Sequence, residues 1–381
     1  MHGTEALIKW PGGKSREIRY IRDMIPSFDR YIEPFFGGGA MFFHLRPEAA
    51  AINDLSEDLM AFYTLVKAQD PAFQAYLTAY ARLFGTLLDA CGRHGEALAV
   101  LFLCAKAGGM TAAALSEPVA RLAEALLREL PVGDLALLVR DREGFLRSLT
   151  ENGADKLVRT VKNNSKKPFS EEDLRENLVT GFASGFYMYF RGVYNDLHRE
   201  SADGGDTAYR IANFYFIREY CYGSMFRYNR QGEFNIPYGG MSYNRKDFGA
   251  KVRSIFSGDT AALFRGTETY CLDFEMFLDE VAPTAADFLF LDPPYDTDFS
   301  DYEGMAFTRE DHRRLADCLK RTSAQFILII QNNDYIHSLY ADRFNILTFD
   351  KTYSYNVRSR NDRSAEHLIV TNLPVKGRLP T

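Results

Sequence analysis

The fold is decided by the stretch Phe288-Leu289-Phe290-Leu291-Asp292-Pro293-Pro294-Tyr295. Its first half is a short apolar run, which is typical of a strand buried in a parallel sheet. Its second half ends that strand with a carboxylate, two prolines with restricted φ angles, and an aromatic ring. Because ligands of open α/β sheets bind at the carboxyl ends of the strands, the sequence predicts a site directly after this strand.

Four further apolar runs also end at a turn or a polar residue. They are residues 31–33, 49–52, 269–272 and 326–330. Helical patterns lie between several of these runs, for example at residues 56–67 and 308–321. This alternation predicts a fold of the α/β class, Rossmann-like, with a mainly parallel sheet.

A long insertion interrupts the alternation. Residues 71–208 are rich in Ala, Leu and Arg and predict a helical insertion with a core of its own. Residues 209–255 are aromatic, rich in Asn and Gly and locally basic, and Gln231-Gly232 is typical of a hairpin tip. We therefore expect a discontinuous α/β domain, residues 1–70 and 256–381, which is split by the helical insertion and a β-hairpin region.

Composition excludes several classes of protein. The chain has 381 residues and a formal net charge of −6, which argues against non-specific coating of nucleic acid but leaves local binding open. Its five cysteines show no CxxC spacing and predict neither a disulfide framework nor a zinc site. The apolar run at residues 97–105 is too short to span a bilayer, and the first residues lack an apolar signal core. We expect no membrane segment, no metal and a reducing cytoplasmic setting.

A glycine-rich turn follows the first strand and reads Pro34-Phe35-Phe36-Gly37-Gly38-Gly39. Glycine lets a ligand approach the backbone closely, although a plain turn is the alternative for any single GxG. Phe42 stands where a dinucleotide fingerprint needs a third small residue, so no pyrophosphate is expected. The next strand ends at Asn53-Asp54, and an acid at that position can bind a ribose diol. The pattern predicts a nucleoside cofactor.

The segment Lys9-Trp10-Pro11-Gly12-Gly13-Lys14-Ser15 is similar to the end of a phosphate-binding loop. The full loop needs Gly at the position of Ile8, so an ATPase loop is excluded. We expect Trp10, Pro11, Gly12 and Lys14 to contact the cofactor instead.

A basic, aromatic stretch between Arg227 and Arg253 holds six basic and two acidic residues. Arg bonded to guanine and Asn bonded to adenine are common base contacts in the major groove, and other basic residues hold phosphates. A solvated hairpin is the alternative. We expect DNA contacts from Lys9, Tyr222, Met225, Arg227, Asn229, Arg230, Asn235 and Pro237.

In this order, the segments resemble the Dam-type (D12 class, alpha-group) site-specific DNA adenine-N6 methyltransferases. The matching segments are residues 9–14, 33–40, 53–54, 227–239, 271–274 and 292–295, with a weaker match in an expected closing strand at 366–372. The resemblance implies the Rossmann-like methyltransferase fold and transfer of a methyl group from S-adenosylmethionine to N6 of an adenine flipped out of duplex DNA.

The resemblance also implies residue roles. Trp10, Lys14, residues 35–39 and Asp54 would contact the cofactor, and Asp273 and Phe274 would border its adenine. We also expect cofactor contacts from Pro34, Asn53 and Asp292. Asp292, Pro293, Pro294 and Tyr295 would hold the flipped base. The amino nitrogen of adenine is a poor nucleophile because its lone pair is delocalised. Acceptors at Asp292 and the Pro293 carbonyl can draw it towards tetrahedral geometry, while Tyr295 stacks on the ring and eases the developing positive charge.

Two departures from the family pattern bear on specificity and size. The insertion is longer by roughly a hundred residues. The approach to the hairpin reads Tyr222-Gly223-Ser224-Met225, where known relatives carry Tyr-Asn-Gly-Leu, so a GATC target is not assured. We expect a monomer on double-stranded DNA in a bacterial or phage-infected cell, with a cognate restriction endonuclease as a candidate partner.

Three alternatives stay open at this point. The first is methylation of the cytosine amino group, although that class more often carries serine in place of Asp292. The second is an RNA adenine methyltransferase, which would not need a duplex-reading hairpin. The third is a DNA-binding protein without catalytic activity.

Overall fold

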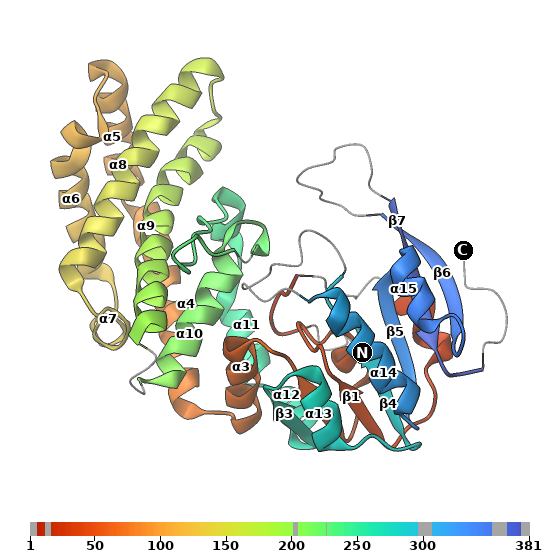
Figure 1. Ribbon diagram of the computed structural model, residues 1–381. Helices are drawn as coiled ribbons and strands as arrows, with labels where there is room; N and C mark the ends of the chain where they lie inside the picture. Colours follow the sequence, from red (N-terminus) through yellow and green to blue (C-terminus); the bar gives the residue numbers. More distant parts are fainter. Residues whose placement is uncertain are drawn as a thin grey trace. The chain divides into compact units, whose positions relative to one another are not determined.

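The computed structural model describes residues 6–11, 17–200, 205–225, 227–295, 307–352 and 364–374. The chain divides into two compact units, and each is described by itself (Figure 1). The first unit consists of Met1–Ala68 and Gly258–Thr381, and the second consists of Gln69–Ser257.

The first unit is built on a seven-stranded sheet with the order β3-β2-β1-β4-β5-β7-β6. The strands are β1 (Arg30–Glu33), β2 (Ala50–Asn53), β3 (Thr267–Tyr270), β4 (Asp287–Leu291), β5 (Gln325–Gln331), β6 (Asn345–Thr352) and β7 (Ser364–Thr371). β7 runs antiparallel to both of its neighbours, whereas the five strands from β3 to β5 pair in parallel. The predicted α/β fold with a mainly parallel sheet is confirmed.

The strand order reverses between β1 and β4. From β1 the chain proceeds outwards to β2 and β3, and it then returns to β4 on the other side of β1. Such a reversal leaves the loops after the two central strands diverging, which opens a crevice at the carboxyl edge. The glycine turn and Asp292 follow these two strands directly.

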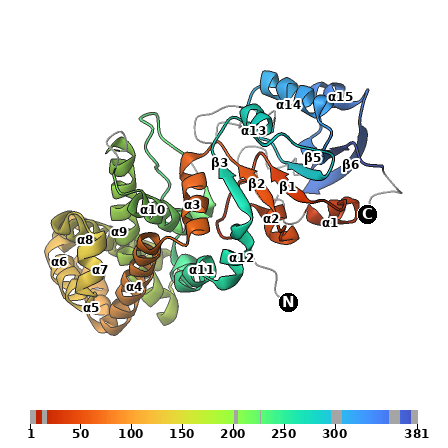
Figure 2. The same ribbon diagram turned by 90° about the horizontal axis from the view of Figure 1, so that it is seen from below.

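Helices cover both faces of the sheet, as Figure 2 shows. They are α1 (Ile18–Ile21), α2 (Ala40–Leu45), α3 (Glu57–Ala68), α12 (Gly258–Arg265), α13 (Phe274–Val281), α14 (Arg309–Arg321) and α15 (Asp334–Tyr340), with a short 3-10 helix at Arg22–Met24. One face, which carries Ile32 and Leu289, packs against α13, α14 and α15. On the other face, the Tyr31 ring lies 6.4 Å from that of Phe42 in α2. The unit is therefore a three-layer α/β/α structure, in which neighbouring strand residues face opposite layers.

Two strands differ from the expectation. β3 lies two residues earlier than the apolar run at 269–272, because its bounds follow the backbone pairing of Thr267 with Ala50 and of Tyr270 with Asn53. β6 was not predicted, since an edge strand with charged residues near its end lacks a continuous apolar run. The shift of β3 leaves Asp273 beyond the strand, where it caps α13.

The second unit is mainly helical. Its helices are α4 (Pro71–Arg93), α5 (Gly95–Gly108), α6 (Ala112–Glu129), α7 (Val132–Leu138), α8 (Arg142–Lys166), α9 (Glu171–Glu200), α10 (Thr207–Tyr220) and α11 (Phe248–Ile255), with 3-10 helices at Tyr222–Ser224 and Met241–Arg245. Helices thus occupy both ends of the expected hairpin region, 209–255, and the hairpin is confined to its middle. Gly185 lets α8 and α9 approach closely, because a Cβ there would lie 2.7 Å from the Leu149 Cα.

No helix in the described parts of the chain combines the length and the apolar character that crossing a membrane requires. Within the same residues, no three His, Cys, Asp or Glu side chains are grouped in a way that would hold a metal ion.

Candidate active site

The carboxyl edge of the first unit gathers polar groups from three adjacent strands. β1 ends at Glu33, β2 ends at Asn53 with Asp54 next, and β4 is followed by Asp292. Because β2, β1 and β4 are parallel neighbours, these residues meet at one edge although the chain separates them widely. The three predicted motifs are thus brought together.

The glycine turn after β1 has a backbone that only small residues fit. Gly37 and Gly39 have φ angles of 50° and 66°, in the left-handed region. A Cβ at Gly37 would lie 2.9 Å from Cδ1 of Trp10, and one at Gly39 would lie 2.5 Å from Cζ of Phe36. The turn therefore tolerates no side chain at Gly37 or Gly39, because the rings of Trp10 and Phe36 already fill the space that a Cβ would take. Lys9 is exposed, Pro11 is half-buried, and Gly12 and Lys14 lie outside the described residues.

Asp54 holds the glycine turn in place. Its Oδ2 accepts a hydrogen bond from the Gly37 N–H at 2.8 Å, and its Oδ1 accepts one from the Ser56 N–H at 3.0 Å. Burial raises the pKa of Asp54, and the N–H groups of Ser56 and Gly37 partly oppose that rise. The Leu55 N–H lowers the pKa of Asp54 as well, so three backbone N–H groups use most of the roughly four acceptor positions of this carboxylate.

Asn53 is buried, and its amide joins two loops. Nδ2 donates to the carbonyl oxygens of Pro34 and Leu272, both at 3.0 Å, and Oδ1 accepts from the Leu272 N–H at 2.9 Å. The amide is thus largely used by the backbone, and it sets the spacing between the loops after β1 and β3. This supporting role was not predicted, because it depends on a loop more than two hundred residues away in the chain.

Asp273 and Phe274 begin α13 beside the glycine turn. Asp273 Oδ1 accepts from the Glu275 N–H at 3.0 Å, and Arg314 Nη2 donates to the same oxygen at 2.6 Å. The Phe274 ring lies 5.5 Å from the ring of Phe35, which follows β1. The expected adenine wall therefore stands next to the turn.

Arg314 was missed by the sequence reasoning. Its Nε donates to Glu275 at 2.9 Å, and its guanidinium lies 4.8 Å from the centroid of Phe274. The hydrogen bond to Asp273 raises the pKa of Arg314, because the carboxylate favours the charged guanidinium. In the sequence, Arg314 is one of several charged residues of α14 and resembles a solvated side chain.

The Asp292–Tyr295 motif has a graded exposure. Asp292 and Tyr295 are half-buried, Pro293 is buried and Pro294 is exposed. The Tyr295 ring lies 5.3 Å from the His367 ring at an angle of 71°. His367 is buried on β7, opposite Gln331 of β5. This edge-on ring contact was also missed, because no local pattern joins the two residues.

Glu33 is buried beneath the site. The Tyr31 hydroxyl donates to its Oε2 at 2.8 Å. Burial raises the pKa of Glu33 well above its ordinary range, the bond from Tyr31 lowers it in part, and the charges of Asp292 and Asp54 raise it further. When Glu33 is neutral, it adds no negative charge to the edge that already carries the carboxyl groups of Asp54 and Asp292.

The hairpin of the second unit is short. Tyr228 pairs with Phe234 and Cys221 with Tyr238, and Gly232 has a φ of 78° at the tip. Asn229 shapes that tip, since its Oδ1 accepts the N–H groups of Gln231 and Glu233, both at 2.9 Å. The exposed predicted DNA contacts are Tyr222, Met225, Arg227, Arg230 and Pro237, and Asn229 and Asn235 are half-buried.

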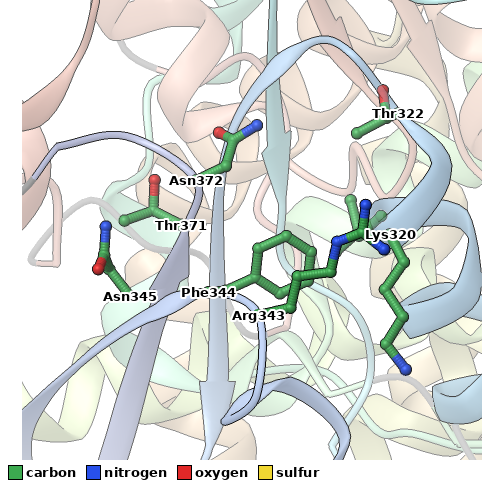
Figure 3. Close-up of a pocket in the computed structure, with 8 residues that line it drawn as sticks. Lys320, Thr322, Arg343, Phe344, Asn345, Thr371 and Asn372 are labelled. Carbon is green, nitrogen blue, oxygen red and sulfur yellow. The ribbon is translucent and has the colours of Figure 1, made fainter.

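A separate cavity of about 250 Å³ lies at the opposite edge of the sheet (Figure 3). Its lining residues lie at the end of α14, the start of β6 and the end of β7. Asn345 and Asn372 line it, and their amides donate to the carbonyls of Leu373 and Ala324, both at 2.8 Å. It contains none of the predicted site residues.

Replacement of Glu33 by Gln tests the electrostatics of this edge. Above the ordinary pKa of Glu, the unfolded chain loses the proton that folded Glu33 keeps, so the parent protein becomes less stable as pH rises. Glu33→Gln lacks this loss, and its advantage is expected to grow by up to about 1.4 kcal/mol per pH unit between pH 5 and 7. Urea unfolding at several pH values measures it.

The matched control is Glu117→Gln, which changes an exposed carboxylate on α6. If Glu33→Gln and the parent protein have stabilities that run parallel from pH 5 to 7, folded Glu33 does not keep its proton.

Comparison with known proteins supplies an independent test. The model of the D12 class N6 adenine-specific DNA methyltransferases matches residues 10–86 and 147–355. The Type II methyltransferase M.CviBI of Paramecium bursaria Chlorella virus NC1A is 24% identical over 373 residues, which is 96% of this chain and 98% of that protein. The DNA adenine methylase of Vibrio cholerae serotype O1 (strain O395) is 21% identical over 371 residues, 95% of this chain and 94% of its own.

A third relative is the Type II methyltransferase M.MjaIII of Methanocaldococcus jannaschii, which is 24% identical over 347 residues, 87% of this chain and 85% of its own. The family match includes Trp10, the glycine turn, the hairpin and Asp292. It favours adenine in DNA over the cytosine and RNA alternatives. The chain belongs to the D12 class N6 adenine-specific DNA methyltransferases, and its reaction is the site-specific transfer of a methyl group from S-adenosylmethionine to adenine in DNA.

Proposed function

We propose that the carboxyl edge of the first unit binds S-adenosylmethionine next to a flipped adenine. The observation that carries the proposal is the pairing of β1 with β4, which brings the glycine turn and Asp292 to one edge. The residues present fit the cofactor: Gly37 and Gly38 are half-buried and carry no Cβ, so a ligand can approach their backbone. Asp54 keeps acceptor capacity for a ribose hydroxyl beside its three backbone N–H partners, and Asp273 with Phe274 offers an acceptor and an apolar wall.

The contacts with the cofactor follow from this arrangement. Residues 34–39 and Trp10 would lie along it, Pro11, Gly12 and Lys14 would reach its amino acid end, and Asp54 would take its ribose. We assign Asn53 the task of holding these loops rather than a direct contact, since its amide bonds to Pro34 and Leu272. When bound, S-adenosylmethionine supplies the methyl group as an electrophile; no metal is needed.

The Asp292–Tyr295 motif would bind the target base. The Asp292 carboxylate and the Pro293 carbonyl accept hydrogen bonds from the two N–H groups of the adenine amino group. These two bonds direct the lone pair of the nitrogen towards the methyl group. Fixed acceptors stabilise the positive charge on that nitrogen without any reorganisation. Tyr295 stacks on the base, and the buried His367 ring supports it from the side. The proton leaves after the transfer.

The hairpin would read duplex DNA. Arg227 is exposed and would bond to a guanine, while Lys9 and Arg230 would hold phosphates. On the same hairpin Pro237 is exposed and Asn235 half-buried, and both would face DNA, while Asn229 shapes the tip. Flipping costs a few kcal/mol in lost stacking and pairing. Tyr222 and Met225 expose 45% and 36% of their surface beside the hairpin, and they would fill the space that the base leaves.

The target sequence need not be GATC. Gly223 replaces an amide side chain, has a φ of 63°, and donates its N–H to the Tyr243 hydroxyl at 3.1 Å.

We further propose a monomer on double-stranded DNA in the cytoplasm. Two relatives are named Type II methyltransferases, which supports a cognate restriction endonuclease as a partner.

Replacement of Asp292 by Ala tests the catalytic assignment. The change removes one acceptor for the amino group, so kcat is expected to fall at least a hundredfold, roughly the effect of removing one preorganised group in other enzymes. The affinity for S-adenosylhomocysteine, measured by calorimetry, should fall much less. Asp317→Ala, on exposed α14 surface, is the control. A loss of affinity with kcat unchanged at saturating S-adenosylmethionine would assign Asp292 to cofactor binding alone.

Replacement of Arg227 by Ala tests the reading of DNA. If Arg227 bonds to a guanine, the change costs roughly 1–3 kcal/mol and relaxes the choice at one base pair. Methylation rates on duplexes that differ at single positions of the target measure this. A uniform loss across all the duplexes would mean that Arg227 holds a phosphate.

A further inference from the structure

The return strand of the hairpin, residues 234–236, is bonded by side chains of α9. Asn195 Nδ2 donates to the Phe234 carbonyl at 3.1 Å, and its Oδ1 accepts from the Phe234 N–H at 2.8 Å. These two bonds occupy both backbone groups of one residue, as a hydrogen-bonded residue on an antiparallel strand would. The Asn195 amide therefore makes the two hydrogen bonds that a neighbouring strand would otherwise make to Phe234.

The same helix face continues the contact. Arg191 Nη1 donates to the carbonyls of Asn235 and Ile236 at 3.2 and 3.3 Å. The Tyr187 hydroxyl donates to the Ile236 carbonyl at 2.9 Å. Because Tyr187, Arg191 and Asn195 are four residues apart, they share one face of α9 and meet successive residues of the return strand. We call these three side chains the α9 ladder.

The ladder is connected to Arg227 through the hairpin backbone. The Asn235 N–H donates to the Arg227 carbonyl at 3.3 Å, and Tyr228 pairs with Phe234. Each side chain of the α9 ladder bonds to the return strand, and the return strand in turn bonds to the backbone of Arg227. The Arg227 side chain is exposed, so its direction depends on that backbone.

A hairpin this short is not stable by itself. Isolated two-stranded hairpins are marginal in water, and this one has a single bridge between Tyr228 and Phe234 near its tip. Tyr194 and Arg199, also on α9, bond Tyr228 and Glu233 at 3.0 and 2.9 Å near the tip, and the ladder holds the return strand. A bidentate contact with a base tolerates little displacement, whereas contacts with phosphates tolerate more.

We propose that the α9 ladder, with Asn195 at its centre, positions Arg227 and so sets how strictly the enzyme discriminates its target from near-target sequences. Asn195 is a positioning residue, since it acts through the hairpin and not on DNA. This rests on the proposed function, in which Arg227 reads a base.

The test compares Asn195→Leu with Asn177→Leu. Leucine keeps the approximate size of asparagine and removes both hydrogen bonds. Asn177 lies on the same helix, but its amide donates to the Asp173 carbonyl within α9, so its replacement leaves the hairpin untouched. The target sequence is first identified by mapping the methylated positions. The readout is then the discrimination ratio, which is kcat/KM for the target duplex divided by kcat/KM for a duplex with a single mismatch. Thermal melting and affinity for S-adenosylhomocysteine monitor the fold.

Asn195→Leu is expected to lower the discrimination ratio roughly tenfold, since two ordinary hydrogen bonds are lost. Asn177→Leu should leave the ratio unchanged. Neither variant should change the affinity for S-adenosylhomocysteine. Arg191→Met, which removes the adjacent rung, should act in the same direction and serves if Asn195→Leu does not fold. In an Arg227→Ala background, Asn195→Leu should lower the ratio no further, because the side chain that it positions is already gone.

Two results would overturn the proposal, and they have different meanings. If Arg227→Ala relaxes discrimination while Asn195→Leu and Arg191→Met do not, the ladder only stabilises the fold and the reading by Arg227 stands. If Arg227→Ala leaves discrimination unchanged, the hairpin does not read a base through Arg227, and the proposed function and this inference fail together.

Discussion

The parallel pairing of β1 with β4 is the constraint on which the candidate site depends. Ile32 lies opposite Leu289 in this pair, and each strand ends shortly afterwards, one in the glycine turn and the other in Asp292. More than two hundred residues separate the two segments, including the whole second unit. The insertion therefore leaves the candidate site intact, because the hydrogen bonds of the sheet, and not the chain between its strands, bring the glycine turn and Asp292 together.

Buried polar contacts then hold the edge in shape. Asp54 bonds to the Gly37 N–H, Asn53 bonds to two loops, and Arg314 bonds to Asp273. Polar groups in such places must be satisfied, so each fixes the geometry of a loop that would otherwise move. Burial raises the pKa of Glu33 well above its ordinary range, so the neutral form of this buried carboxyl is favoured beside Asp292 and Asp54. In the second unit, Asn195 does the same for the hairpin.

Local pattern was enough for much of the fold and for the motifs. β1, β2, β4 and β5 were predicted within one residue at each end, because buried parallel strands read as apolar runs. β6 was missed, since its place is set by pairing with β7 and not by its own composition. Arg314, His367 and Asn195 were missed for the same reason: each acts on a residue far away in the chain. Asn229 looks like a base reader in the sequence, yet its side chain bonds to the backbone of its own turn. The site assignments stay predictions.

The most direct test of the central claim identifies the methylated base. The enzyme is incubated with labelled S-adenosylmethionine and unmethylated genomic DNA, the DNA is digested to nucleosides, and the labelled product is identified while its positions are mapped by single-molecule sequencing. The account predicts N6-methyladenine at one short motif, and none with Asp292→Ala. Label on cytosine, or no transfer to any DNA despite measurable cofactor binding, would contradict it.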